Sequence, residues 1–239
     1  MKKIFALVFA ACFTLSGCAE LQQVAAQLPQ TAGGILSNAD IAAGLKEALD
    51  KGIDTQVSKL TKTDGFYKNQ LVKILLPDEL QKVDKTLRTM GLGSLADEGL
   101  KVLNRAAEDA VKEATPIFVN AVKQMTFNDA KNILLGNDQA ATTYLKSTTS
   151  TQLYSKFNPV IKSSFAKVGA DKVWTNIITQ YNKVPLVQKV DPDLTNYVTN
   201  KAMDGVFKMI AIEEKNIRTD INARTSALLK RVFALQDTK

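Results

Sequence analysis

Apolar residues recur every three or four positions along most of the chain, and this spacing predicts an all-α fold. The clearest stripe follows Ser37, a candidate N-cap, and consists of Ile41, Leu45, Leu49, Ile53, Val57 and Leu60. A row of small residues runs beside it and predicts the close approach of a second helix: Gly44, Ala48 and Gly52. Similar stripes continue to Phe233 with no alternation of strands and helices, so we expect one bundle of about nine or ten helices over residues 37–239.

Turn and cap residues set the expected helix boundaries. Pro77 opens a helix that Gly91 ends. Thr126 and Asp129 form a capping signal for a short helix that Gly136 closes. Two further helices are expected in succession after it, the first through Tyr144 and the second over 153–168.

The run from Leu71 to Leu76 is the one stretch of the chain that is compatible with a strand. It is short and apolar and it ends at Pro77, but six residues do not separate a helix from a strand by period alone. We expect an extended segment against the helical body, or one short strand near 71–76.

The first residues have the order of a lipoprotein signal peptide. Lys2 and Lys3 precede an apolar run from Ile4 to Leu15, which is shorter than the ~20 residues of a membrane-spanning helix. Small residues then precede Cys18. We expect transfer of a diacylglycerol to the Cys18 thiol, cleavage before Cys18 that removes residues 1–17 as the signal peptide, and acylation of the new N-terminus with a fatty acid such as palmitate.

Residues 18–36 then read as a lipidated N-terminus and a flexible tether. Position 19 is Ala and not Asp, which in enteric-type bacteria favours transfer to the outer membrane. No later apolar run approaches the length of a membrane span. The expected location is therefore the outer membrane, with a lipid anchor as the only membrane attachment and the body in the periplasm.

Composition excludes much of the usual catalytic chemistry. The 239 residues include no histidine and two cysteines, of which Cys12 leaves with the signal peptide and Cys18 carries lipid. Histidine-based triads, histidine metal sites and thiol chemistry are therefore excluded, and we expect no metal and no cofactor. The net charge of +7 is modest and spread along the chain, which argues against nucleic-acid binding.

Two polar sets interrupt otherwise apolar helices and form the candidate polar network together with Asp129. In each set an arginine and a carboxylate lie three or four residues apart, on one helix face. The residues are Asn104, Arg105, Glu108, Glu213, Glu214 and Arg218. Three readings stay open: exposed ion pairs, a partly buried network that fixes helix packing, or a site that binds a cation or performs acid–base chemistry.

Three further patterns occur in the sequence. Trp174 and Tyr181 lie seven residues apart on one helix and are candidates for an apolar pocket, although such spacing is more common in a core. Ser164 and Lys167 match S-x-x-K without its partner motifs. The G-x-G-x-x-A match at 91–96 follows a helix where a dinucleotide loop needs a strand, so we interpret it as a helix stop followed by a helix start.

Many short stretches in the same order resemble one bacterial family of unknown function, DUF4197. They include Ala43–Leu49, Asp64–Phe66, Ile74–Pro77, Asn104–Glu108, Asp129–Ala130 with Ile133–Leu134, Ala140–Thr142 with Tyr144, and Glu213–Glu214 with Ile217–Arg218. The resemblance covers nearly all of Ser37–Phe233. It implies an exported, largely helical protein of Gram-negative bacteria, and it implies no activity or catalytic residue.

The leading functional hypothesis is an outer-membrane lipoprotein whose helical body acts as a binding or scaffold protein for an envelope partner. The first alternative is a carrier or sensor of a lipid-like apolar ligand held between helices. The second is a carboxylate-based hydrolase, which needs Glu108 close to Glu213 or Glu214. The sequence favours a protein without enzymatic activity, and it does not indicate an oligomeric state.

Overall fold

The structure is a computed structural model that describes residues 36–237, apart from positions 90, 92, 170, 171, 173, 176, 177, 180, 181, 184, 187, 188, 190 and 192. The predicted signal peptide, Cys18 and nearly all of the tether lie outside the described residues. Residues Asn38–Lys239 form one compact unit, and the description below concerns that unit.

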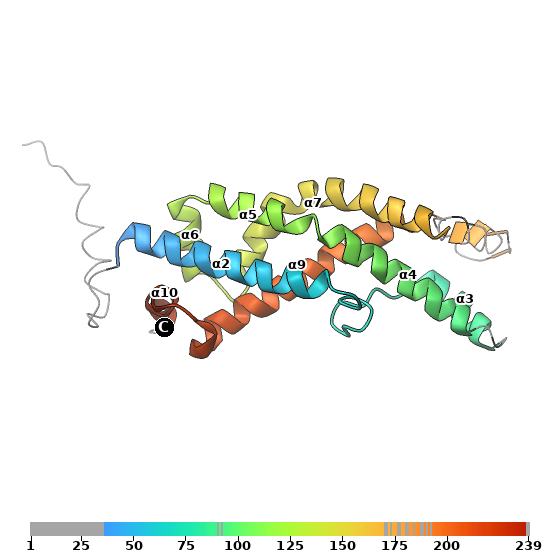
Figure 1. The fold of residues 1–239 in the computed structure, drawn as a ribbon, viewed down its shortest axis with the longest axis horizontal. Helices are drawn as coiled ribbons and strands as arrows, with labels where there is room; N and C mark the ends of the chain where they lie inside the picture. Colours follow the sequence, from blue (N-terminus) through green and yellow to red (C-terminus); the bar gives the residue numbers. More distant parts are fainter. Residues whose placement is uncertain are drawn as a thin grey trace, which may run out of the picture. The chain divides into compact units, whose positions relative to one another are not determined.

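All regular secondary structure in the described ranges is helical, as predicted (Figure 1). The α-helices are α2 (Asn38–Leu60), α3 (Gln81–Thr89), α4 (Gly93–Val111), α5 (Ala114–Gln124), α6 (Phe127–Leu135), α7 (Ala140–Lys167), α9 (Thr195–Thr219) and α10 (Ala227–Asp237). Two short 3₁₀ turns, η1 (Asp78–Leu80) and η2 (Ile221–Ala223), precede α3 and α10.

Helix α9 is the central element of the unit, because it packs against α7, α2 and α4. In Figure 1 its orange-to-red ribbon crosses behind α2. Its inward face is apolar over most of its length, with buried residues such as Val198, Val206 and Ile210. The exceptions are the polar residues Thr195 and Thr199 and the charged residues Glu214 and Arg218, which are also buried. The predicted polar set therefore lies in the interior of the fold.

Helix α2 confirms the predicted stripe and the row of small residues. Leu45, Leu49 and Ile53 are buried in the core. A Cβ atom placed on Gly44 would lie 2.7 Å from Val232 Cγ2 of α10. Because that distance is shorter than a van der Waals contact, only glycine allows α10 to approach α2 this closely.

The predicted number of nine or ten helices is not matched by the described part of the chain. The separate helices expected through Tyr144 and over 153–168 are one continuous helix, α7. Pro159 lies inside it, where it removes one backbone hydrogen bond without ending the helix. Pro116, in contrast, follows a break, since α4 ends at Val111 and α5 begins at Ala114. It occupies the first turn of α5, where its missing N–H has no intrahelical partner to lose.

The expected strand near 71–76 is wrong: these residues form turns and irregular backbone. They are nevertheless pressed onto the helical body, as the alternative prediction stated, since Val72, Ile74 and Leu76 are buried. A strand needs a neighbouring strand to bond its backbone. Here the backbone N–H and C=O of Ile74 instead bond the side-chain amide of Asn104.

The predicted caps are largely confirmed. Thr126 and Asp129 form a reciprocal capping box at the start of α6, and Gly136 caps its end. Gly91 follows α3 with φ = 76°, a left-handed conformation that glycine adopts without strain.

Candidate functional site

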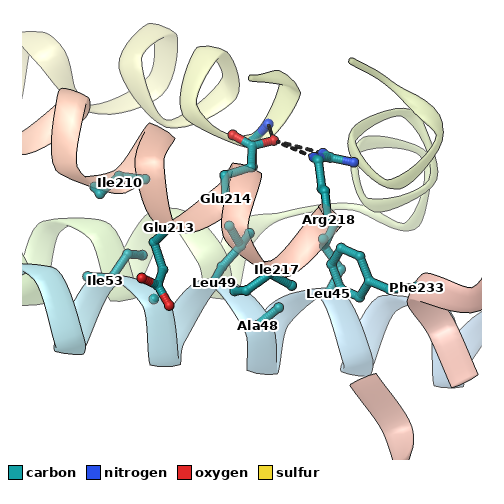
Figure 2. A pocket seen from close by; sticks show the side chains of 12 residues that line it. Leu45, Ala48, Leu49, Ile53, Ile210, Glu213, Glu214, Ile217, Arg218 and Phe233 are labelled. Carbon is teal, nitrogen blue, oxygen red and sulfur yellow. Dashed lines mark hydrogen bonds and ion pairs between the residues drawn. The ribbon is translucent and has the colours of Figure 1, made fainter. Parts of the chain in front are cut away.

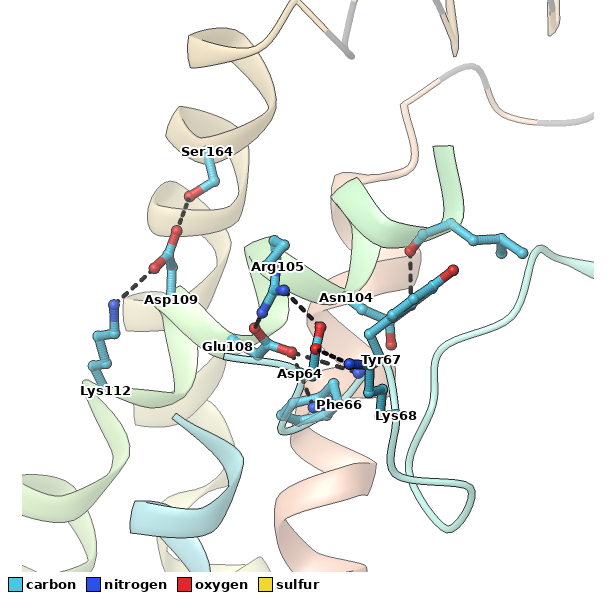
Figure 3. A network of polar contacts seen from close by, with 11 residues as sticks. Asp64, Phe66, Tyr67, Lys68, Asn104, Arg105, Glu108, Asp109, Lys112 and Ser164 are labelled. Carbon is cyan, nitrogen blue, oxygen red and sulfur yellow. Dashed lines mark hydrogen bonds and ion pairs between the residues drawn. The ribbon is translucent and has the colours of Figure 1, made fainter. Parts of the chain in front are cut away.

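The first polar set joins α4 to the segment that follows α2. Glu108 is buried, and its Oε1 accepts hydrogen bonds from the backbone N–H of Phe66 at 3.0 Å and of Tyr67 at 3.4 Å. Its Oε2 accepts a hydrogen bond from Arg105 Nη1 at 2.6 Å. Arg105 also reaches Asp64 Oδ1 at 2.6 Å, so one guanidinium bridges two carboxylates (Figure 3).

Asn104 bonds the same segment eight residues further along. Its Oδ1 accepts a hydrogen bond from Ile74 N at 2.8 Å, and its Nδ2 donates to Ile74 O at 2.9 Å and to Leu100 O at 2.7 Å. The side-chain amide therefore satisfies both backbone polar groups of a buried residue, as a neighbouring strand would.

The turn at Asp64 and Gly65 shapes the start of this segment. Asp64 has φ = 67°, which aspartate tolerates better than most residues. A Cβ atom on Gly65 would lie 2.5 Å from Leu60 O, so the chain can leave α2 here only through glycine. The hydrogen bond from Lys68, followed by the charge of Arg105, holds the pKa of Asp64 below its usual value.

The segment also contacts α9. The buried ring of Phe66 lies over Gly205, where an added Cβ atom would be 2.7 Å from Phe66 Cε1. The hydroxyl of Tyr197 donates to Leu75 O at 2.8 Å. Contacts with α4 and α9 thus fix both ends of the segment from Thr61 to Pro77, which we name the docking loop.

The second polar set lies where α6 ends and α7 begins. Glu214 accepts hydrogen bonds from the backbone N–H of Ala141 and Thr142, each at 2.8 Å, and from the Thr142 hydroxyl at 2.8 Å. Those N–H groups belong to the first turn of α7, which has no intrahelical acceptor for them. Gln139, the N-cap residue of α7, makes no side-chain cap, and the carboxylate of α9 caps the helix in its place.

Arg218 caps the C-terminal end of α6, where backbone carbonyl groups lack intrahelical donors. Its guanidinium donates to Ile133 O at 2.8 Å and Leu134 O at 3.2 Å, and it binds Glu214 Oε1 at 2.7 Å (Figure 2). The carboxylate thus meets a helix N-terminus and the guanidinium meets a helix C-terminus, which is the favourable arrangement for both helix dipoles.

Arg224 is a buried charge that periodicity did not reveal. It donates to Ile217 O at 3.0 Å and Arg218 O at 2.8 Å, at the end of α9, and it forms a two-pronged ion pair with Asp237. The hydrogen bonds from Arg224 lower the pKa of Asp237. Arg224 lies between η2 and α10, whereas Asp237 is the last residue of α10, so no helical spacing connects the two residues in the sequence.

The remaining residues of the candidate network take separate roles. Asp129 belongs to the capping box of α6, where its carboxylate accepts hydrogen bonds from the backbone N–H and the hydroxyl of Thr126. Glu213 points from α9 toward α2 and accepts a hydrogen bond from Gln56 Nε2 at 2.6 Å. Gln56 is only 2% exposed, and its Oε1 has no hydrogen-bond partner in the described part of the chain.

A small cavity lies between α2, α9 and α10, beside Glu213 and the Glu214–Arg218 pair (Figure 2). Its volume is about 20 Å³, which is room for a water molecule and far too little for an acyl chain. Its lining is mainly apolar and includes Leu45, Leu49, Ile53, Ile210, Ile217 and Phe233.

The described residues cover the remaining predicted sites only in part. Trp174 is buried, and a Cβ atom on Gly99 of α4 would lie 2.7 Å from its ring, so the indole is packed against that helix. Tyr181 lies outside the described residues. Ser164 donates to Asp109 Oδ2 at 3.2 Å rather than to Lys167, although all three residues line an open groove on α4 and α7.

Glu108 and Glu214 belong to separate hydrogen-bond networks with no residue in common. Within the described ranges, no group of three or more metal-ligating side chains is placed to hold a metal ion, and every helix is too short or too polar to cross a lipid bilayer. The geometry supports the second of the three readings, a buried network that fixes how helices and one loop pack.

The fold and these networks define an all-helical protein in which one buried ion pair, Glu214–Arg218, caps the ends of two neighbouring helices and a second polar set fixes a loop. The sequence model of the family described as "Protein of unknown function (DUF4197)" matches residues 35–234, and the chain belongs to this family. No curated protein and no solved structure matches the chain.

Proposed function

We propose that this protein is an outer-membrane lipoprotein, anchored through Cys18, whose periplasmic helical body acts by binding a partner and not by catalysis. The observation that supports binding most directly is the docking loop. Its backbone is fixed by buried Asn104 and Glu108, yet Leu71 and Leu75 remain 50% and 55% exposed. Exposed apolar side chains mark an interaction surface where they form a contiguous patch.

The polar residues of the candidate network favour binding over the hydrolase alternative. The carboxylates of Glu108 and Glu214 each accept two backbone N–H groups and one guanidinium. These contacts occupy the carboxylate oxygens and leave no free base beside a second acid. The same residues therefore account for the position of the loop and of α7, without a substrate.

Anchoring is tested by the substitution Cys18→Ser. We expect the variant to lose incorporation of labelled palmitate and to accumulate as the uncleaved precursor, while its circular dichroism stays helical. Cell fractionation and mass spectrometry of the N-terminus are the measurements. A Cys18→Ser protein that still fractionates as a mature acylated lipoprotein would overturn the proposed anchor.

Binding through the docking loop is tested by site-specific photocrosslinking in intact cells. A photoreactive amino acid at position 71 is expected to yield a discrete adduct with an envelope component, either protein or lipid. The matched control carries it at Leu135, which is 41% exposed at the end of α6. Equal labelling at 71 and 135, or none at 71, contradicts a role for this loop.

A further inference from the structure

Resting on the proposed lipid anchor, we propose that the docking loop contacts the surface of a lipid bilayer with anionic headgroups. Leu71 and Leu75 enter the boundary between headgroups and acyl chains, and Lys68 and Lys73 face the headgroups. The loop thereby sets the orientation of the helical body on the membrane that holds the anchor.

Alternating exposure along the loop supports this assignment. Val72, Ile74 and Leu76 are buried against the helical body, while Leu71 and Leu75 are exposed and Lys73 is half-buried. This alternation arises although the backbone is a turn at 71–72 and irregular over 73–76. The outward sequence is thus leucine, lysine, leucine on a rigid support.

The neighbourhood of these leucines has the composition of a membrane-interface surface. Lys73 Nζ lies 4.4 Å from the centre of the Tyr67 ring. Tyr197, bonded to the loop at Leu75, carries Lys201 Nζ at 5.7 Å from its ring centre. Tyrosine and lysine side chains both extend an apolar body with a polar end, which suits the boundary between water and acyl chains.

The acidic groups near the loop are already paired with cations. Asp64 binds Arg105 and Lys68, while the ammonium of Lys68 stays exposed. Asp97 is bound by Arg88 at 2.7 Å. Its pKa is lowered first by that hydrogen bond and further by the charge of Lys73. This pairing reduces the repulsion between these carboxylates and an anionic surface.

The size of the patch favours a bilayer over a protein partner. A stable protein interface buries ~800 Å² on each side, and two half-exposed leucines supply a small fraction of that area. A bilayer requires no complementary pocket. From Cys18 to Asn38 the chain can extend at most roughly 65–70 Å, so an anchored body stays near the membrane and even a weak contact is populated.

The test uses the absence of other thiols in the mature chain. Full-length lipoprotein carrying Leu71→Cys is labelled with an environment-sensitive fluorophore and reconstituted into vesicles of phosphatidylethanolamine with about a quarter phosphatidylglycerol. We expect a several-fold rise in emission and strong quenching by nitroxide-labelled lipid. Leu135→Cys, labelled in the same way, is the matched control and should show neither.

Charge is tested in the same assay. Vesicles of phosphatidylcholine alone, or the additional substitution Lys73→Glu, should remove at least half of the rise at position 71. Water-like emission at 71, or equal signals at 71 and 135, would overturn the inference. An adduct with a protein at position 71 in cells, together with water-like emission in vesicles, overturns it while the proposed binding function stands.

The wild-type chain separates failure of the anchor from failure of the inference. Acylated Cys18 has no thiol, so the wild-type protein should take up no fluorophore. Labelling of Cys18 would overturn the lipid anchor, and with it the membrane contact that rests on the anchor.

Discussion

Glu214 and Arg218 lie one helical turn apart on α9, and each meets the end of a different helix. The carboxylate accepts the free N–H groups of α7, and the guanidinium donates to the free carbonyl groups of α6. Neither charge contacts water freely, since both side chains are buried. Such a pair costs desolvation energy, which its hydrogen bonds to helix ends offset. At the scale of single residues, these charges cap the end of α6 and the start of α7.

Removing the carboxylate of this pair should destabilise the fold strongly. In Glu214→Gln, Arg218 stays buried without a charge partner, so we expect a loss of ~3–5 kcal/mol in the free energy of unfolding. The matched control is Glu213→Gln, the half-buried neighbour, with an expected loss below ~1 kcal/mol. Urea unfolding followed by circular dichroism measures both. Equal losses in the two variants would contradict the capping role of Glu214.

Asn104 should control the docking loop more than the bundle. Asn104→Ala leaves the buried N–H and C=O of Ile74 without partners, at a cost of ~1–3 kcal/mol. Because the lost bonds belong to the loop, amide exchange at Ile74 should accelerate more than exchange in α9. Hydrogen-exchange mass spectrometry of the intact protein measures this difference. The exposed Asn120→Ala on α5 serves as control, and comparable protection of Ile74 in both variants would speak against the assignment.

At the scale of elements, the docking loop owes its conformation to the helices beneath it. Its own sequence contains a turn at Asp64 and Gly65 and an apolar run, but no partner strand. Helix α4 provides the hydrogen-bond partners, and α9 provides a flat site at Gly205 for the Phe66 ring. The loop is therefore rigid without regular secondary structure, and this lets exposed leucines persist beside a packed core.

Gly205→Ala tests this support. In a helix interior, alanine is more favourable than glycine by ~1 kcal/mol. The substitution would therefore stabilise the protein if the space beside Gly205 were empty. The added Cβ atom would instead lie 2.7 Å from Phe66 Cε1 and 3.3 Å from Val72 Cβ, so we expect a net loss of ~1–3 kcal/mol. Gly93→Ala, where the nearest side-chain atom is 3.7 Å away, is the control and should be neutral or stabilising. A stable Gly205→Ala protein with unchanged loop protection would refute the close contact.

At the scale of the whole molecule, the absence of histidine sets the response to pH. No side chain has an ordinary pKa near 6.5, so the free energy of unfolding should change little around neutrality. The pKa values of Asp64, Asp129 and Asp237 are lowered in the folded state by their hydrogen bonds. Burial raises the pKa of Asp50, which acts in the opposite direction.

Stability should therefore fall only in acid. A lowered folded-state pKa gives stability that is present above the unfolded value of about 4 and is lost as the pH falls through the folded-state pKa. We expect urea midpoints to be flat near pH 7 and to decline below about pH 4. Asp237→Asn should lower the midpoint at neutral pH and reduce the acid decline. A steep change between about pH 6 and 8 would contradict this expectation.

The all-α class, the stripe of α2, the capping box of α6 and the family resemblance could all be predicted from the sequence. Each depends on residues within a few positions of one another, where helical spacing and cap chemistry operate. The Glu214–Arg218 and Arg105–Glu108 pairs were also found for that reason, because their spacing is three or four residues. The same local signals wrongly predicted a break between Tyr144 and Leu153, where the structure has one continuous helix, α7.

What only the tertiary structure decided is which distant groups those charges meet. Glu214 reaches α7, Arg218 reaches α6, and Asn104 replaces a neighbouring strand for Ile74. A buried side chain is stabilised by whichever backbone groups lack partners nearby, and the packing of helices far apart in sequence determines which groups those are. Local sequence thus determined the helices, and tertiary packing determined that the candidate site residues cap helices and fix a loop.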